Sequence, residues 1–289
     1  MKKVLGLKIE NEVAWYLFAV IITGWISGFI MTSSSFSSSI ITTSYYIFLY
    51  SPFLVALFFL VYDTELLEKV VRNIFTVRTV IGSITGVMLI YILIILSYFF
   101  LYKINMIIPS PKFHNQYAEL NLIVLAGLFV KVFTSSILPS LALGLGEEVG
   151  WRGFLQHKLS QRHTFPVTVS IVSVFWFLWH LPVILSRSNY QLEAIIFNSL
   201  TMLLLTVSLT VILGFFFRLT ESVIVVALMH VANNAFQNSA TGLFLVTTNL
   251  HVAKLLTYTT YVGFAAILII VFFRKELKIP NIFKLKSKH

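Results

Sequence analysis

Three short polar motifs in the hydrophobic second half of the chain carry residue types that can activate water. Their sequences are EEVGWR at residues 147–152, WFLWH at 176–180 and HVANN at 230–234. Together they supply a carboxylate, two imidazoles and an amide from three separate segments, which is the inventory of a hydrolytic site or of a site for a single metal ion. A separate packing role for each of these polar groups is the poorer explanation.

The two adjacent glutamates of the first motif are expected to do different work. Side chains one residue apart on a helix diverge by about 100°. Arg152 follows Glu148 by four residues, which is the spacing of an ion pair across one helical turn, and it follows Glu147 by five. We therefore expect Glu148 to pair with Arg152 and Glu147 to remain the free carboxylate. Taken alone, the motif is equally compatible with an ordinary helix end stabilised by a salt bridge.

Glycines surround these charges and recur at regular spacing elsewhere. Four of them bracket the first motif, at positions 144, 146, 150 and 153. Because glycine weakens a helix, they indicate a break or a re-entrant turn here. Two further pairs, Gly24 with Gly28 and Gly82 with Gly86, have the spacing that favours close packing of membrane helices.

The other two motifs place histidines on apolar helices. His180 follows Trp176 by one turn inside an aromatic stretch, and alone it would be interpreted as a hydrogen-bonded packing residue. His230 and Asn234 lie four residues apart and project from one helix face. Asn233, one position earlier, is open as a substitute for Asn234. Alone, this motif also fits a hydrogen-bonded patch between helices.

The elements that position these residues must be membrane helices. The chain of 289 residues is 58% hydrophobic and 11% charged, with a mean hydropathy of +0.90, whereas soluble domains have roughly 25% charged residues. No change of composition divides it, so we predict one integral membrane domain over residues 1–289. The predicted fold is all-α, a polytopic helical bundle.

About eight apolar runs are long enough to cross a hydrocarbon core of roughly 30 Å. They are predicted at Val13–Met31, Ser44–Tyr62, Thr79–Tyr102, Leu122–Gly146, Phe165–Leu185, Ala194–Phe217, Val223–Gln237 and Leu256–Phe273. The seventh is short and polar, so its side chains need a lining of protein or water.

The distribution of Lys and Arg predicts the orientation of these spans. Sixteen of the 21 fall in segments on the side of the N-terminus, four fall on the opposite side, and Lys131 lies within the fourth span. This bias places both termini in the cytoplasm, and the net charge of +10 then indicates contact with anionic lipids and no nucleic-acid partner. We expect the motifs to meet at a wet cavity near the inner leaflet, although straight helices place His230 roughly 10 Å and His180 roughly 20 Å from the cytoplasmic edge.

Several kinds of protease are excluded by residue counts. Asp63 is the only aspartate, which excludes a site with two catalytic aspartates. The chain has no cysteine and no G-x-S-x-G elbow, so cysteine and rhomboid-like serine nucleophiles are excluded. The HExxH helix of common zinc proteases is also absent, which favours chemistry without a metal.

The three motifs, in this order and spacing, resemble the CAAX protease and bacteriocin-processing (CPBP) group of intramembrane proteases, which includes the type II CAAX prenyl endopeptidases. The pattern of that group is EExxxR, then FxxxH, then HxxxN or HxxxD. The chain departs from it at Trp176, which stands where the pattern has Phe. The resemblance implies a core of about eight helices, with the catalytic part at about residues 120–240.

The resemblance also implies roles for the motif residues. It implies an endopeptidase in which Glu147 and His180 activate water while His230 and Asn234 bind the oxyanion. Glu148, Arg152 and Trp176 would support the site or orient the substrate. In the alternative metal version, Glu147, His180 and His230 bind a divalent ion such as zinc, so the cofactor is either none or such a metal. The implied substrate is a membrane-bound protein or peptide, and the expected location is a cell membrane, that of a bacterium.

Two other functions are compatible with the sequence. A transporter would use Lys131, Glu147, Glu193 and the histidines along a pathway. A non-catalytic membrane protein, such as one that binds a bacteriocin for self-immunity, would use the same pocket without hydrolysis.

Overall fold

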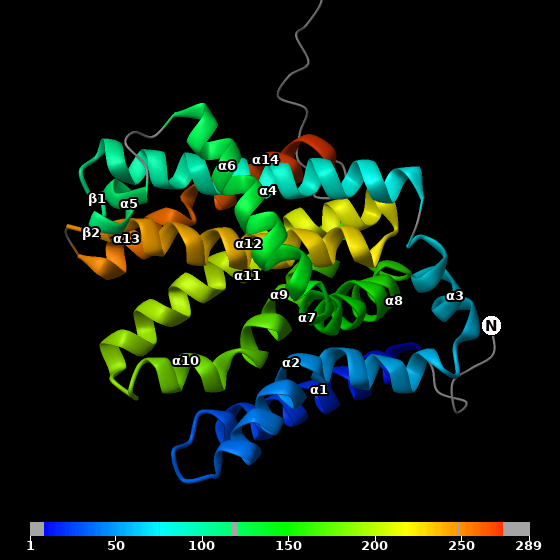
Figure 1. Cartoon of the computed structure of the whole chain (residues 1–289). Coiled ribbons are helices and arrows are strands. Elements are labelled where there is room, and N and C mark those ends of the chain that lie inside the picture. Colours follow the sequence, from blue (N-terminus) through cyan, green and yellow to red (C-terminus); the bar gives the residue numbers. More distant parts are fainter. Residues whose placement is uncertain (1–8, 75, 117–120, 248, 274–289) are drawn as a thin grey trace, which may run out of the picture.

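A computed structural model describes residues 9–74, 76–116, 121–247 and 249–273 and shows a bundle of long helices (Figure 1). Lys2, Lys3, Lys8 and the basic tail from Arg274 lie outside the described residues, so the cytoplasmic placement of both termini stays a prediction. The elements are α1 (Ile9–Met31), α2 (Ser38–Leu60), α3 (Thr64–Arg72), α4 (Val77–Lys103), β1 (Ile107–Pro109), α5 (Pro111–Gln116), α6 (Leu122–Val132), η2 (Phe133–Ile137), α7 (Leu138–Glu148), η3 (Val149–Gln156), α8 (His157–Ser160), α9 (Phe165–Trp179), α10 (Leu181–Arg187), α11 (Leu192–Thr220), α12 (Val223–Leu243), β2 (Phe244–Val246), α13 (Leu250–Thr257) and α14 (Thr259–Phe273).

The predicted all-α membrane bundle is confirmed. Among the described residues, six helices are long and apolar enough to span a bilayer, or seven when α9 and α10 count as one span bent by 45°. Helix α12 is a further helix of 21 residues, which carries the polar HVANN motif. The exact count of eight spans stays a prediction.

Helix α12 occupies the centre of the bundle, where it packs against α4, α7 and α11. Glycines allow this proximity. A methyl group at Gly144 of α7 would lie 2.8 Å from the carbonyl oxygen of Ala227 in α12, and one at Gly86 of α4 would lie 2.5 Å from the sulfur of Met229. The end of α7 is therefore held directly against the helix that carries His230.

The predicted break at the first motif is wrong. Residues 122–160 form one continuous helical span, in which Val149–Gln156 widens into π-helical turns. The glycines serve packing here, since methyl groups at Gly146 and Gly150 would overlap Tyr50 and Pro52 of α2. Protein thus covers the helix on this face. π-Helical turns are rare and occur often at functional sites.

Two small features tie the ends of the bundle together. At one end, β1 and β2 form an antiparallel pair, and the backbone N–H of Ser110 donates to the carbonyl of Leu243 at 2.9 Å, which joins the region after α4 to the end of α12. At the other end, the ammonium of Lys158 lies 2.7 Å from Asp63 and 2.9 Å from Glu12, which joins α8 to the regions of α1 and α3.

Candidate active site

Glu147 lies on the last turn of α7 with only 7% of its surface exposed. Its Oε2 atom accepts a hydrogen bond of 3.0 Å from the indole N–H of Trp176. Its Oε1 atom faces the imidazole of His230, 3.9 Å from Nε2. One oxygen of this carboxylate is thus anchored, while the other shares a gap with an imidazole nitrogen.

Glu148 is completely buried and holds two partners. The guanidinium of Arg152 donates to it at 2.9 Å, and Nδ1 of His230 donates to it at 2.8 Å. The ion pair predicted from the four-residue spacing is therefore present. Because Nδ1 carries the proton shared with Glu148, the Nε2 atom is the one presented to Glu147.

Arg152 is also fully buried. It contacts both Glu148, which binds His230, and Trp176, which binds Glu147. Besides Glu148, its guanidinium donates to the hydroxyl of Thr210 at 3.3 Å and lies over the Trp176 ring, 4.5 Å from the ring centroid. A displacement of Arg152 would therefore move both Glu148 and Trp176.

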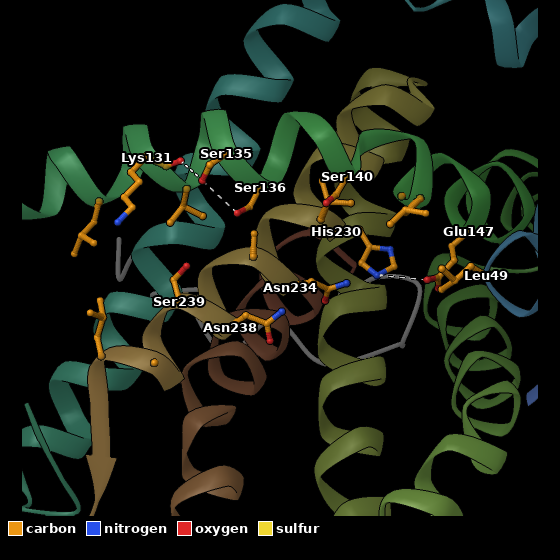
Figure 2. A pocket seen from close by; sticks show the side chains of 18 of the residues that line it. Leu49, Lys131, Ser135, Ser136, Ser140, Glu147, His230, Asn234, Asn238 and Ser239 are labelled. Carbon is orange, nitrogen blue, oxygen red and sulfur yellow. Dashed lines mark hydrogen bonds and ion pairs between the residues drawn. The ribbon is translucent and has the colours of Figure 1, made fainter. Parts of the chain in front are cut away.

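Asn234 and Asn233 have different surroundings. Asn234 is exposed within a cavity, whereas Asn233 is buried. The amide of Asn233 donates to Oδ1 of Asn234 at 3.1 Å and accepts from the hydroxyl of Tyr261 at 3.0 Å. This chain of hydrogen bonds occupies the Asn234 oxygen and leaves its N–H₂ group available, on the side of His230 (Figure 2).

His180 lies at the junction where α10 bends away from α9 by 45°. Its Nδ1 atom donates to the carbonyl of Trp176 at 2.8 Å, and its ring packs edge-on against Trp179, 4.7 Å between centroids. Among the described residues, its hydrogen bond is made within its own helix and none joins it to Glu147. The structure thus brings Glu147, His230 and Asn234 to one cavity, whereas His180 is not part of the lining of that cavity.

A cavity of about 590 Å³ opens beside Glu147 and His230. Figure 2 shows the α6–α7 span on one side and α12 on the other, with Glu147 and His230 at one end and Lys131 at the opposite end. From the site, the cavity extends along α12 towards Gly242, the end joined to the β1–β2 region. It therefore extends away from the end of the bundle that holds α3 and α8, and its expected position near the inner leaflet stays a prediction.

The metal version of the site is not matched by the geometry. Within the part of the chain that the structure describes, no group of three His, Asp or Glu side chains is close enough together to hold a metal ion. Glu147 and His230 form a pair, and His180 does not complete it. The cofactor therefore stays a prediction.

Other cavity residues were not singled out from the sequence. The lining of α12 continues from Asn234 to Asn238, and that of the α6–α7 span includes Ser136 and Ser140. The signal was available, because these residues repeat the four-residue spacing of one helix face. Lys112 had no such signal, since β1 and α5 bring it to the cavity from a distant part of the sequence.

Only some of the residues proposed for a transport pathway line the cavity. Lys131 lines the cavity together with Glu147. Glu193 instead lies exposed in the first turn of α11 and is not part of the cavity lining.

The motif residues lie within a region that matches a known family. The sequence model of the family described as Type II CAAX prenyl endopeptidase Rce1-like matches residues 129–236, which include all three motifs. CAAX prenyl protease 2 of Methanococcus maripaludis is 37% identical over 70 residues, which are 23% of this chain and 25% of the relative, so the chain spans about a quarter of that protein. Residues 129–236 are therefore similar to the Rce1-like type II CAAX prenyl endopeptidases, in agreement with the resemblance of the three motifs to the CAAX protease and bacteriocin-processing group.

Proposed function

We propose that this protein is an intramembrane endopeptidase that hydrolyses a peptide bond of a membrane-associated protein or peptide. The observation that carries the proposal is the pair of Glu147 and His230, whose facing atoms lie 3.9 Å apart at a polar cavity inside a helical bundle. A gap of this size lets one water molecule beside the pair contact both atoms. The match of residues 129–236 to the family model supports the reaction class.

In the proposed reaction, Glu147 acts as the general base. It takes a proton from water while the water oxygen bonds to the carbonyl carbon of the substrate, and the carbonyl becomes an oxyanion. The C–N bond then breaks, and the proton held by Glu147 passes to the leaving nitrogen. The hydrogen bond from Trp176 keeps one carboxylate oxygen in place, so that the other oxygen is free to accept a proton from the water.

Stabilisation of the oxyanion is assigned to Asn234 and His230. The N–H₂ group of Asn234 is the available half of its amide, since Asn233 occupies the oxygen. His230 donates from Nε2 when both of its nitrogens are protonated. A preorganised donor of this kind is worth about 3 to 4 kcal/mol of transition-state stabilisation.

The remaining motif residues are positioning residues in this proposal. Glu148 fixes which nitrogen of His230 faces the cavity, and Arg152 neutralises Glu148 and supports Trp176. His180 holds the backbone of the same tryptophan through its hydrogen bond to the Trp176 carbonyl. Its proposed share in activating water is therefore exerted through Trp176 in this arrangement.

The substrate is proposed to reside in the membrane because the site lies between apolar helices. The name of the archaeal relative, a CAAX prenyl protease, agrees with a substrate anchored to a membrane. We propose the cell membrane as the location of the multi-pass protein.

A pair of matched variants tests this function. Glu147→Gln removes the base but keeps the shape of the side chain, and Glu193→Gln removes an exposed glutamate outside the cavity. Membrane peptides are compared by mass spectrometry between cells that carry the wild type, each variant or no protein. We expect products with the wild type and with Glu193→Gln, and none with Glu147→Gln. Identical peptides with and without the base at position 147 would refute the proposal.

A further inference from the structure

The proposed catalytic cavity has opposite charges at its two ends. Among the described residues that line it, Glu147 is the only acidic residue, and Lys112 and Lys131 are the only Lys or Arg residues. Among the described residues, neither lysine has an ion-pair partner. An unpaired lysine on a membrane helix is costly and marks a functional site by default.

Both lysines lie at the end of the cavity far from the Glu147–His230 pair. Figure 2 shows Lys131 at that end, with its ammonium directed towards the space between the helices, and Ser239 of α12 lines the same cavity. Lys112 belongs to α5, which follows Ser110, and Ser110 is hydrogen-bonded to Leu243 at the end of α12. Two positive charges thus converge from different segments on one end of a polar cavity.

The separation of the charges defines a length of peptide. Lys131 and Glu147 lie sixteen residues apart on one continuous helical span, so their Cα atoms are about 24 Å apart along the axis. The wider π-helical turns of η2 and the glutamate side chain, which leans towards Lys131, shorten this to roughly 18 Å, which an extended peptide covers with about five to six residues at 3.3 Å each. The wall between the ends offers hydroxyl and amide groups from Ser136, Ser140 and Asn238 to a peptide backbone.

We propose that Lys112 and Lys131 form an anion subsite that binds a carboxylate of the substrate five to six residues from the bond that is cut. This inference rests on the proposed function and adds a specificity rule to it. The carboxylate is either an acidic side chain or the C-terminus of the peptide, because both present the same group to an ammonium. A charge-assisted hydrogen bond in a partly solvated cavity gives such substrates an advantage of about tenfold in kcat/KM.

The test uses the purified full-length protein in phosphatidylcholine vesicles and synthetic peptide libraries. One library has a single Glu at varied positions and an amidated C-terminus, a second has a free C-terminus and no acidic side chain, and a third has neither carboxylate. Cleavage positions and rates are read by mass spectrometry. We expect cuts five to six residues from the carboxylate in one or both of the first two libraries, about tenfold faster than in the third.

Lysine variants link the preference to the subsite. In Lys131→Gln and in Lys112→Gln the advantage of acidic peptides should fall below twofold, and Lys131→Arg should keep it. Lys131→Glu should instead favour peptides with a lysine at the same distance. Lys254→Gln, a lysine of α13 that does not line the cavity, is the control and should match the wild type.

Each contrary result has a distinct meaning. Cleavage that depends on Glu147 but has no fixed distance to a carboxylate overturns the subsite and leaves the proposed function intact. If cleavage rates depend on the amount of added phosphatidylglycerol and not on peptide charge, the lysines contact lipid phosphate. This result also overturns the anion subsite. If the wild type cuts no more peptides than Glu147→Gln does, both proposals are rejected.

Discussion

The Nδ1 atom of His230 donates a hydrogen bond of 2.8 Å to Glu148, so the second glutamate of the pair orients the imidazole that faces the first. Two adjacent residues of the same type thereby act on one histidine from two sides. Glu148 is completely buried and paired with Arg152, whereas Glu147 borders the cavity. Substitutions of the two glutamates are therefore expected to have different consequences.

Glu148→Gln should destabilise the protein strongly. It leaves the buried guanidinium of Arg152 without its counter-charge, and breaking a buried ion pair costs about 3 to 5 kcal/mol. Glu147→Gln should cost much less, because the described partners of Glu147 are the indole of Trp176 and the imidazole of His230 at 3.9 Å, and no guanidinium depends on its charge alone. Thermal unfolding in detergent, compared at one pH, distinguishes the two variants. Equal midpoints for both would contradict the assigned division of roles.

Trp176→Phe should lower activity with little change in fold. Phenylalanine keeps a ring beneath Arg152 but loses the N–H that anchors Glu147 at 3.0 Å. Loss of a hydrogen bond to a charged group costs about 1.5 kcal/mol or more, hence roughly a tenfold fall in kcat. Steady-state kinetics with a cleaved peptide provide the measurement. A fall confined to substrate affinity, with kcat unchanged, would argue against this anchoring role.

Gly144→Ala should separate α7 from α12. The added methyl would lie 2.8 Å from the Ala227 carbonyl, so the two helices must move apart and the contact between Glu147 and His230 must change. We expect activity to fall by at least tenfold, because misplacement of catalytic groups by about 1 Å has effects of this size. The control is Gly263→Ala, where no described atom outside the adjoining turns of its own helix lies within 4 Å of the added methyl. Similar activity in both variants would contradict the prediction.

Acid should weaken the junction between Asp63 and Lys158. Burial alone would raise the pKa of Asp63, but hydrogen bonds from Lys158 and from the backbone of Leu66 outweigh burial and lower the pKa from the usual 3.8. The stabilisation is thus complete above about pH 4 and is lost as the pH falls through the lowered folded pKa. Asp63→Asn should be less stable than the wild type at neutral pH and should lose less stability on acidification. Parallel stability curves from pH 6 to pH 3 would rule this out.

The sequence predicted correctly those features that depend on interactions between residues close together in the chain. The i, i+4 spacing of Glu148 and Arg152 predicted their ion pair, and the apolar runs predicted a membrane bundle. The glycines around the first motif were misinterpreted because their effect depends on tertiary packing: the neighbouring backbone of Pro52 covers Gly150 and keeps the helix continuous.

Contacts between residues on different helices could not be predicted from the motifs. Nothing in WFLWH shows that the hydrogen bond of His180 stays within its own helix, or that Trp176 reaches Glu147 instead. The direction of the cavity was also missed, since it depends on how α5 and the β1–β2 pair bring Lys112 to the end of α12.

Under the proposed function, the outer surface of the α6–α7 span sets how a membrane-bound substrate approaches the protein. Leu122 and Ile123 are more than 80% exposed, and Val130 and Leu138 are about half exposed, so in a bilayer this wall faces acyl chains. A lipid-tethered substrate therefore meets the protein by lateral diffusion, and the encounter rate depends on molecules per unit area of membrane. Diluting vesicles that contain both partners with buffer should leave the turnover unchanged, whereas diluting them by fusion with empty vesicles should slow it.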